Sequence, residues 1–237
     1  MSRASRSGSL PPAAVFLAAL LTVARPGAAA GDPVRAADAS VLYNAGTRAL
    51  ERDELGEAVA FLRAAERVDP RAADVRRNLR EARVRAAAAR GADPPSGAAG
   101  APISAPEGWW LASGLLVLGA ILASAAPRGG TGILRRAGQA TLLGGILLFA
   151  WLSLRAREEW RYPSAVVVAP SLPAGPAPDE RPRPPYLLGV GEEVRLGRMR
   201  GALVEIRVGG SVIGWAARSG VWRVADAARY TPRLGRP

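Results

Sequence analysis

The chain has 237 residues, enough for one or two small domains joined by connecting segments. It has no His and no Cys, and its 32 basic residues are all Arg, which excludes Cys nucleophiles, Ser-His triads, soft-metal sites and disulfides. The formal net charge of +12 favours acidic partners, but no segment interleaves aromatic and basic residues as a nucleic-acid surface does. We therefore expect no nucleic-acid binding, no catalytic residues, no cofactor and no metal site.

Residues 1–30 have the order of a secretory signal peptide. Arg3 and Arg6 precede the apolar run AAVFLAALLTVA, and small residues follow at 28–30. Cleavage after Ala30 and retention as an uncleaved anchor both remain open. Either alternative places the segment after Gly31 outside the cytoplasm.

Residues 31–90 have helical periodicity, with small residues at selected positions. One apolar stripe contains Leu42, Ala45, Gly46 and Ala49, and a second contains Ala58, Phe61 or Leu62, Ala65 and Val68. A polar turn at 52–54 separates them, and Pro70 ends the second helix. The pattern predicts an antiparallel helix pair whose backbones cross closely at Gly46 and Ala58.

These positions resemble the signature of a tetratricopeptide (TPR) repeat, whose unit is 34 residues long. Counted from Ala39, the matching positions are Leu42, Ala45, Gly46, Ala49, Ala58, Leu62, Ala65 and Pro70. The next register begins at Ala73, but Arg80 stands where the repeat has Gly, and no second helix follows. The resemblance implies one full repeat plus a half repeat over 31–90.

So short an array leaves a small interior and an uncovered concave groove. The resemblance implies that the first helix of each unit lines this groove, which gives a partner-binding site of Tyr43, Asn44, Thr47, Arg77 and Asn78. A protein partner and a second copy of the chain are both open as occupants. The opposing interpretation is that the two Asn residues make structural hydrogen bonds and that Arg77 is merely solvated.

Residues 91–106 are rich in Pro, Gly and Ala and form an expected linker. Extended at about 3.1 Å per residue, it would reach on the order of 50 Å, so the helical unit could search for a partner above a membrane.

Two apolar segments, 107–126 and 137–156, are predicted to cross the membrane as a hairpin joined by the short basic loop 127–136. Trp109, Trp110, Trp151 and Trp160 are suited to anchor the ends of these helices at the interface. The spacing of Gly119 with Ala123, and of Thr141 with Gly145, permits close helix packing in lipid. The general abundance of Gly and Ala explains that spacing almost as well.

Beyond Pro163 the periodicity alternates. AVVVA (165–169) is typical of a buried strand, and GEEVRL, ALVEIRV, SVIGWA and VWRV predict further short strands of a small antiparallel barrel. With a long Pro-rich loop after the first strand, residues 164–226 resemble a bacterial SH3-like domain. That resemblance implies that Trp215, in the GWA motif, anchors the core; Trp222 is also expected in the core rather than on a ligand platform. Residues 227–237 are expected to be a disordered tail.

The fold class is thus a multidomain membrane protein: a short all-α TPR unit, a two-helix transmembrane hairpin and a small all-β SH3-like barrel. The whole arrangement resembles BatE-type proteins of bacterial aerotolerance operons. That resemblance implies a non-catalytic scaffold in the bacterial inner membrane, with von Willebrand A-domain proteins as partners beside a MoxR-type ATPase. The expected export signal and the two crossings predict that both modules are periplasmic, where each would recruit envelope proteins, and that the 127–136 loop is cytoplasmic. The alternative is a cell-wall sensor or anchor whose SH3-like domain binds peptidoglycan peptide.

Overall fold

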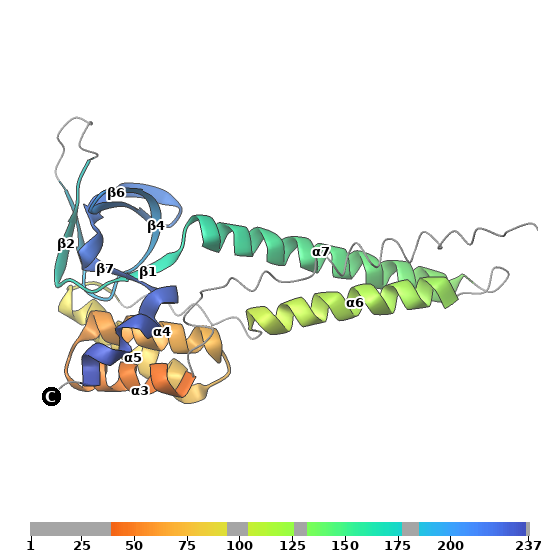
Figure 1. Cartoon of the computed structure of the whole chain (residues 1–237), viewed down its shortest axis with the longest axis horizontal. Coiled ribbons are helices and arrows are strands. Elements are labelled where there is room, and N and C mark those ends of the chain that lie inside the picture. The colour runs from red at the N-terminus through yellow and green to blue at the C-terminus, as the bar shows by residue number, and fades with distance from the viewer. Residues whose placement is uncertain (1–38, 94–103, 126–131, 177–184, 236–237) are drawn as a thin grey trace, which may run out of the picture. The chain divides into compact units, whose positions relative to one another are not determined.

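The computed structural model describes residues 39–93, 104–125, 132–176 and 185–235 (Figure 1). The expected signal segment and most of the expected linker lie outside these residues. The helices, in order, are α3 (Ala39–Glu51), α4 (Leu55–Val68), α5 (Ala73–Ala89), α6 (Ala105–Ala125) and α7 (Ile133–Arg161). The strands and short helices that follow are β1 (Ser164–Val167), β2 (Ser171–Ala174), β3 (Tyr186–Gly189), β4 (Glu193–Arg200), β5 (Leu203–Val208), β6 (Ser211–Ala217), η1 (Arg218–Gly220), β7 (Val221–Arg223) and η2 (Val224–Gly235).

Helices α3 to α5, which we call the helical unit, follow the predicted pattern closely. The polar turn at 52–54 separates α3 from α4, and Asp53 adopts a positive φ of 60° there. A Cβ on Gly46 would lie 2.6 Å from Leu62 Cγ, so the small residue is sterically required. The Leu62 backbone nitrogen lies 3.2 Å from the same Cβ position, so α3 and α4 approach closely at Gly46, and Ala58 is fully buried. Helix α5 buries the predicted stripe of Val75, Leu79, Ala82 and Ala86.

Helices α6 and α7 pack along each other and are each long and apolar enough to cross a membrane. A Cβ on Gly119 would lie 2.6 Å from the Leu142 backbone nitrogen, and one on Gly138 would lie 2.5 Å from that of Ala123. The close packing predicted around Gly119 and Ala123 is thus present. On α7 the small residues that face α6 are Gly138 and the predicted Gly145, whose Cβ position lies 3.0 Å from the Leu116 backbone nitrogen. The Thr141 hydroxyl donates to the Ala137 carbonyl of its own helix.

Helix α7 is longer than the predicted segment 137–156. Its 29 residues measure about 43 Å at 1.5 Å per residue, whereas a hydrocarbon core is about 30 Å thick. The end of α7 can therefore project beyond such a core, and the residues from Arg155 to Arg161 are mostly charged. Large apolar side chains along both helices are exposed, among them Ile121, Leu143, Leu147 and Leu154. This exposure suits a lipid environment.

The strands form an antiparallel sheet in the order β6-β5-β4-β1-β7 and a separate β2-β3 hairpin. Gly175 and Trp215 exchange backbone hydrogen bonds of 2.9 and 2.7 Å, which attach the hairpin to β6. The strands predicted at 165–169, 191–196, 202–208, 211–216 and 221–224 are confirmed, with small shifts of their ends. The segment expected as one long loop differs, because β2 and β3 pair within it.

Strand β1 is buried on both faces. Ala165 and Val167 point into the core of the sheet, whereas Val166, between them, belongs to the hydrophobic core of the helical unit. A strand with one face in water needs apolar residues only at alternate positions. This strand contacts protein on both faces, which explains why the run AVVVA is apolar throughout.

Side chains of the sheet and of η2 also enter the hydrophobic core of the helical unit, which is distinct from the core of the sheet itself. Trp222 on β7 meets the ring of Phe61 on α4 edge-on, with centroids 5.7 Å apart, and stacks on Tyr230 at 4.2 Å. Val224 and Ala227 of η2 are fully buried in the same cluster. We call Phe61, Val166, Trp222 and Tyr230 the shared core.

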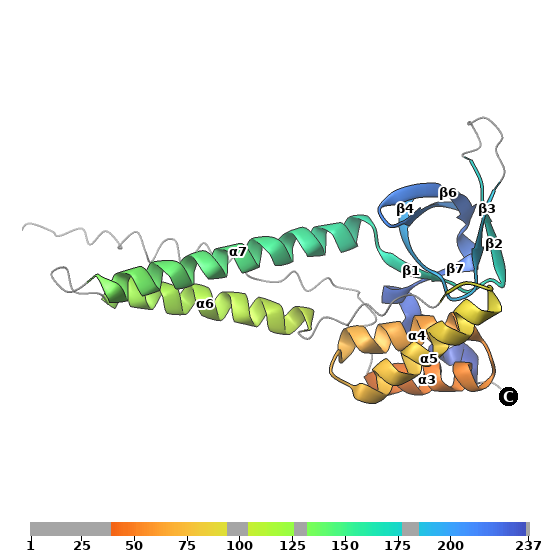
Figure 2. The same cartoon turned by 180° about the vertical axis from the view of Figure 1, so that it is seen from behind.

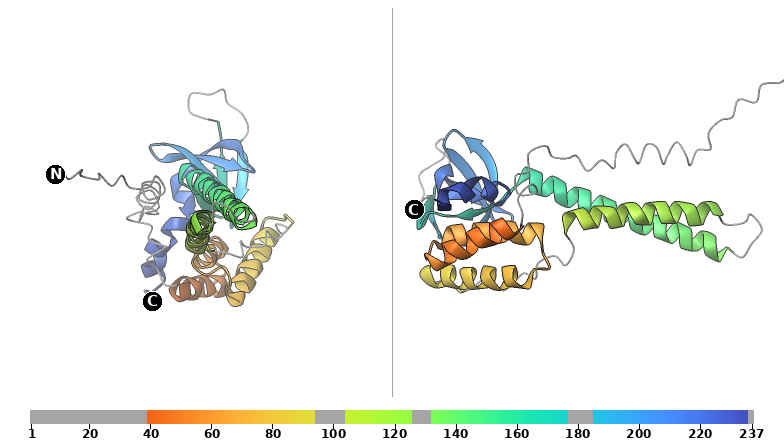
Figure 3. Two further views of the ribbon diagram at one scale, coloured as in Figure 1. Left: turned by 90° about the vertical axis from the view of Figure 1, so that its right-hand side faces the viewer. Right: turned by 60° about the horizontal axis from the view of Figure 1, so that its bottom comes forward.

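Helix η2 contacts α3 and α4, and it lies on the side of this pair that faces away from α5 (Figures 1, 2 and 3). Three expectations are thereby corrected. The described part of the expected disordered tail, residues 227–235, is a 3₁₀ helix that covers the helical unit. The helical unit also does not hang free on a linker, because it packs against the sheet. Trp222, expected in the barrel core, lies in the shared core instead.

The shared core predicts that the two modules unfold together. Trp222→Ala removes a side chain that is 9% exposed and touches both modules, so we expect a loss of about 3–5 kcal/mol of unfolding free energy. Hydrogen exchange of the full chain in detergent should show lower protection in α4 and in β7 together. Trp160→Ala, at an 85% exposed site, is the control and should leave both protected. Loss of protection in β7 alone would contradict a shared core.

The hairpin predicts a position-specific effect of Gly→Leu substitutions. Gly138→Leu places a side chain against the Ala123 backbone and should separate α6 from α7, lowering the thermal unfolding temperature of the chain in detergent by several degrees. Gly144→Leu changes a glycine of the same helix with nothing within 4 Å of its Cβ position and should have little effect. Equal effects of the two substitutions would show that helix propensity, and not packing, is responsible.

Candidate functional site

The predicted groove residues divide into two groups. Asn78 on α5 donates its side-chain amide to the Tyr43 hydroxyl at 3.3 Å and to the Thr47 hydroxyl at 3.1 Å, both on α3. These three side chains are partly buried and join α3 to α5. Asn78 therefore makes structural hydrogen bonds, which was the alternative interpretation that the sequence left open.

Asn44 and Arg77, the remaining groove residues, are exposed. Helical spacing places Val41 on the same face of α3 as Asn44, and Val84 on the same face of α5 as Arg77. Both valines are large exposed apolar residues, at 49% and 47%. Sequence reasoning missed them because a valine within an Ala-rich helix does not signal its own exposure. We call Val41, Asn44, Arg77 and Val84 the α3/α5 face.

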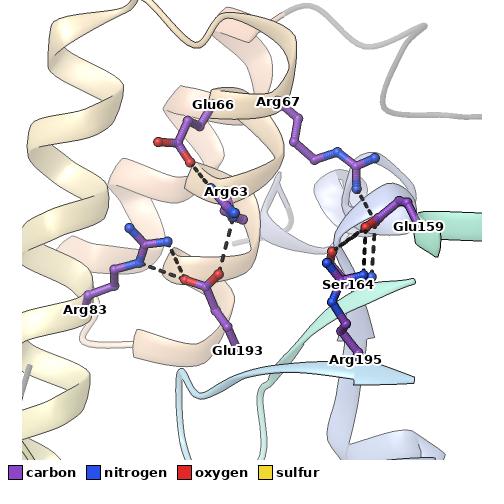
Figure 4. A network of polar contacts seen from close by, with 8 residues as sticks. All are labelled: Arg63, Glu66, Arg67, Arg83, Glu159, Ser164, Glu193 and Arg195. Carbon is purple, nitrogen blue, oxygen red and sulfur yellow. Dashed lines mark hydrogen bonds and ion pairs between the residues drawn. The ribbon is translucent and has the colours of Figure 1, made fainter. Parts of the chain in front are cut away.

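Acidic side chains link the helical unit to the rest of the chain (Figure 4). Glu193, at the start of β4, accepts a hydrogen bond of 2.7 Å from Arg83 Nε on α5 and forms an ion pair of 3.3 Å with Arg63 Nε on α4. Nearby, the Arg90 guanidinium on α5 donates to the Val190 carbonyl at 2.6 Å. These contacts fix α4 and α5 to the turn before β4.

Glu159 performs a similar role at the end of α7. Its carboxylate accepts from Arg67 on α4 at 2.9 Å and from the Ser164 backbone N–H at 3.1 Å, and it lies 3.7 Å from the Arg195 guanidinium (Figure 4). Glu159 thus connects the helical unit, α7 and β4 in one network.

A cluster of Arg side chains surrounds Trp215 on the outer face of the sheet. The Arg198 and Arg200 guanidinium carbons lie 5.9 and 5.3 Å from the Trp215 ring centroid. Trp215 is only 6% exposed, yet it is absent from the buried cluster that fills the sheet core. Trp215 is thus buried as expected, but it lies outside the cluster that fills the sheet core, with its ring beside the two guanidinium groups.

Glu205 lies across from Trp215 in the β5–β6 ladder and is 3% exposed. It accepts hydrogen bonds from Arg198 Nε at 2.9 Å and Arg207 Nη1 at 3.2 Å, and Gly197 leaves space for its carboxylate. Burial by itself would raise the pKa of the Glu205 carboxyl. The hydrogen bonds and charges of Arg198 and Arg207 outweigh burial, so the pKa is lower than its ordinary value.

Comparison with protein-family models, with curated proteins and with solved structures finds no match. Arg side chains, amides and apolar surface are suited to binding a protein or an anionic surface.

The lowered pKa of Glu205 predicts how its contribution to stability depends on pH. Because the native carboxyl binds its proton less readily than the unfolded one, the ionised side chain stabilises the fold at neutral pH, and this contribution is lost as the pH falls through the native pKa. Glu205→Gln should lower the thermal unfolding temperature at pH 7, and the difference from the parent chain should shrink below pH 4. Glu81→Gln, which removes an exposed i,i+4 partner of Arg85, is the control and should matter little at either pH. A difference that grows on acidification would contradict this assignment.

Proposed function

We propose that the chain is a non-catalytic membrane scaffold that recruits a protein partner through the α3/α5 face. One observation carries the proposal: the α3/α5 face is exposed, and the two helices that form it are held together by hydrogen bonds. Asn78 holds α3 and α5 together through Tyr43 and Thr47, while Asn44, Arg77 and two valines remain exposed. A preformed surface of this kind loses little conformational freedom on binding.

The contacts between modules support a two-pass arrangement in the membrane. The helical unit precedes α6 and the sheet follows α7, yet both contribute to the shared core. Segments in contact lie on the same side of a membrane, so an even number of crossings must separate them, and α6 and α7 supply two. The export signal expected over 1–30 favours the periplasmic side for both modules.

The same proposal includes a type for each module and a family for the whole chain. The spacing of small residues in α3 and α4 supports a TPR-type unit, and the strand order with its GWA motif supports an SH3-like domain. Together with the hairpin they favour a BatE-like scaffold of the bacterial inner membrane, with von Willebrand A-domain proteins among its partners. The helical unit and the sheet act in this proposal as one body, since the shared core and Glu193 join them.

The peptidoglycan-sensor alternative receives no comparable support. Trp215 and Trp222, which would be the natural platforms for a cell-wall peptide, are 6% and 9% exposed. We therefore keep the scaffold as the proposed function.

Photo-crosslinking in native membranes tests the proposal. A photoreactive residue at Val84 should yield a discrete heterologous adduct, and Arg77→Glu should reduce its yield about tenfold or more, because an unfavourable charge at an interface costs more than 1.4 kcal/mol. Tyr43 is left unchanged, since its hydroxyl accepts from Asn78. Arg52→Glu makes the same charge change at an exposed turn residue and should preserve the adduct.

The identity of the adduct decides between the remaining alternatives. A von Willebrand A-domain protein would support the BatE-like assignment, and a second copy of the chain would indicate self-association through this face. Adducts that are unaffected by Arg77→Glu, or that form only within one chain, would reject the α3/α5 face as the recruiting surface.

A further inference from the structure

The two helices of the hairpin become charged at the same level. A Cβ on Gly108 of α6 would lie 3.2 Å from Leu152 Cδ2 of α7, so these two residues lie side by side. The nearest charged residue of α6 is Glu107, one residue before Gly108, and that of α7 is Arg155, three residues beyond Leu152. At 1.5 Å per residue, both charged residues lie within about 5 Å of this contact along the helices. We call this height along the hairpin the exit level.

Exposed tryptophans lie on the apolar side of the exit level. Trp110 of α6 is 79% exposed and Trp151 of α7 is 53% exposed, and each lies within four residues of the first charged residue of its own helix. Exposed Trp is favoured where a bilayer changes from hydrocarbon to headgroups. In a membrane crossed by this hairpin, the phospholipid phosphates are therefore expected at the exit level.

The three carboxylates near the exit level are paired with Arg side chains of the helical unit and of β4. The pairs are Glu107 with Arg71 at 3.0 Å, Glu159 with Arg67 at 2.9 Å, and Glu158 with Arg195 at 3.9 Å. The two modules thus supply the cations for these acids. The Arg side chains of α7 itself do not pair with them.

Arg155 is exposed and has an aromatic partner in place of an acidic one. Its guanidinium carbon lies 5.1 Å from the centroid of the Trp151 ring, one helical turn toward the apolar part of α7. Within the described residues, no carboxylate pairs with it. Cation–π attraction holds the guanidinium over the indole, but it leaves the N–H donors of the Arg155 side chain to bind an anion. The cation is thus oriented before any ligand binds.

The face of α7 that carries Arg155 changes from apolar to cationic along its length. Leu147, Trp151 and Arg155 follow at four-residue spacing, so they lie along one face of the helix, and Leu147 is 68% exposed. Gly144, one turn before Leu147, has nothing within 4 Å of its Cβ position, which leaves room for an acyl chain against the helix. An apolar strip, an indole and a guanidinium therefore succeed one another, in the order of the acyl, ester and phosphate parts of a phospholipid.

We propose that Trp151 and Arg155 form a binding site for an anionic phospholipid. The Arg155 guanidinium donates to the headgroup phosphate, the Trp151 indole lies against the ester region, and an acyl chain follows the apolar strip below them. Arg157 is exposed and has no acidic partner among the described residues; its charge favours an acidic headgroup over a zwitterionic one. The inference rests on the proposed membrane insertion of the hairpin. It adds a lipid contact at the end of α7, where Glu159 joins the helical unit and β4.

Native mass spectrometry of the full chain released from nanodiscs tests the site. In nanodiscs that contain phosphatidylglycerol and phosphatidylcholine in equal parts, we expect the chain to retain phosphatidylglycerol preferentially. Arg155→Gln should lower the ratio of bound phosphatidylglycerol to bound phosphatidylcholine about fivefold, because each basic side chain near an anionic headgroup contributes roughly that factor.

Arg161→Gln is the matched control for charge. It removes the same charge from the same helix, from a guanidinium that also lies over an aromatic ring, 5.7 Å from the centroid of Tyr162. Position 161 is about 9 Å farther from the hydrocarbon than position 155, so the lipid ratio should not change. Equal effects of Arg155→Gln and Arg161→Gln would show general attraction to an anionic surface and would overturn the site.

The aromatic part of the site is tested separately. Trp151→Leu keeps the position apolar but removes the ring that orients Arg155, so the lipid ratio should fall about two- to fivefold, the factor that corresponds to an exposed cation–π contact. Trp160→Leu changes another exposed Trp of α7 and should leave the ratio as in the parent chain. A ratio that neither Trp151→Leu nor Arg155→Gln lowers would overturn the proposal.

Two further conditions decide whether the ligand is a lipid. Soluble glycerol phosphate carries the phosphate without acyl chains, and it should not displace the bound phosphatidylglycerol. Displacement would show a site for free phosphate and would overturn the lipid assignment. Equal retention of phosphatidylcholine would overturn the preference for an acidic headgroup.

A spin label separates this inference from the proposed function. The chain has no native Cys, so Leu118→Cys, at a 49% exposed position of α6, gives one labelled site. The label should be accessible to oxygen dissolved in lipid and not to a water-soluble nickel relaxant. If position 118 lies in lipid and Arg155→Gln leaves the lipid ratio unchanged, the binding site is refuted and the membrane scaffold stands. If position 118 lies in water, the hairpin does not insert and both proposals fail.

Discussion

The packing of Trp222 between Phe61 and Tyr230 is the interaction on which the rest of the structure depends. A helix pair with one additional helix buries too little apolar surface to be stable by itself, and repeat arrays answer this by stacking further units. Here α5 covers one side of the α3–α4 pair, and β1, β7 and η2 cover another. The sheet and the C-terminal helix thus take the place of the missing repeats, so neither module is complete without the other.

The polar contacts around this core fix the orientation of the helical unit relative to the sheet and to the end of α7. Glu193 and Glu159 each meet Arg side chains of the helical unit, and Glu159 also belongs to the last turns of α7. Partly exposed ion pairs contribute little stability one by one. Their value here lies in geometry, because they connect two modules and the end of a membrane helix at one place.

Much of the local structure could be predicted from the sequence. The stripes around Leu42 and Leu79, the turn at 52–54, the small residues of α6 and the alternating strands follow from periodicity and steric size alone. What could not be predicted was contact between distant segments. Residues 227–235 were expected to be a disordered tail, and the apolar face of α3 and α4 gives them a partner in the fold. Trp215 shows the same limit, since the two Arg side chains beside its ring come from β4, two strands away in the sheet.

The candidate site was predictable to the same degree. Helical spacing placed Tyr43, Thr47 and Asn78 near one another, but it could not distinguish residues that bond each other from residues that face outward; Asn44 and Arg77 belong to the second kind. Val41 and Val84 became visible only once the exposed faces of α3 and α5 were known.

The position of Trp222 late in the chain also has a consequence for biosynthesis. About 160 residues separate it from Phe61, and at translation rates of 5–20 residues per second the delay is on the order of ten seconds. During that interval the α3–α4 pair has emerged from the ribosome, but β7 and η2, which cover it, have not yet been synthesised. The apolar helices α6 and α7 are made in the same interval. The nascent chain is therefore expected to need a chaperone's protection until its last residues are synthesised.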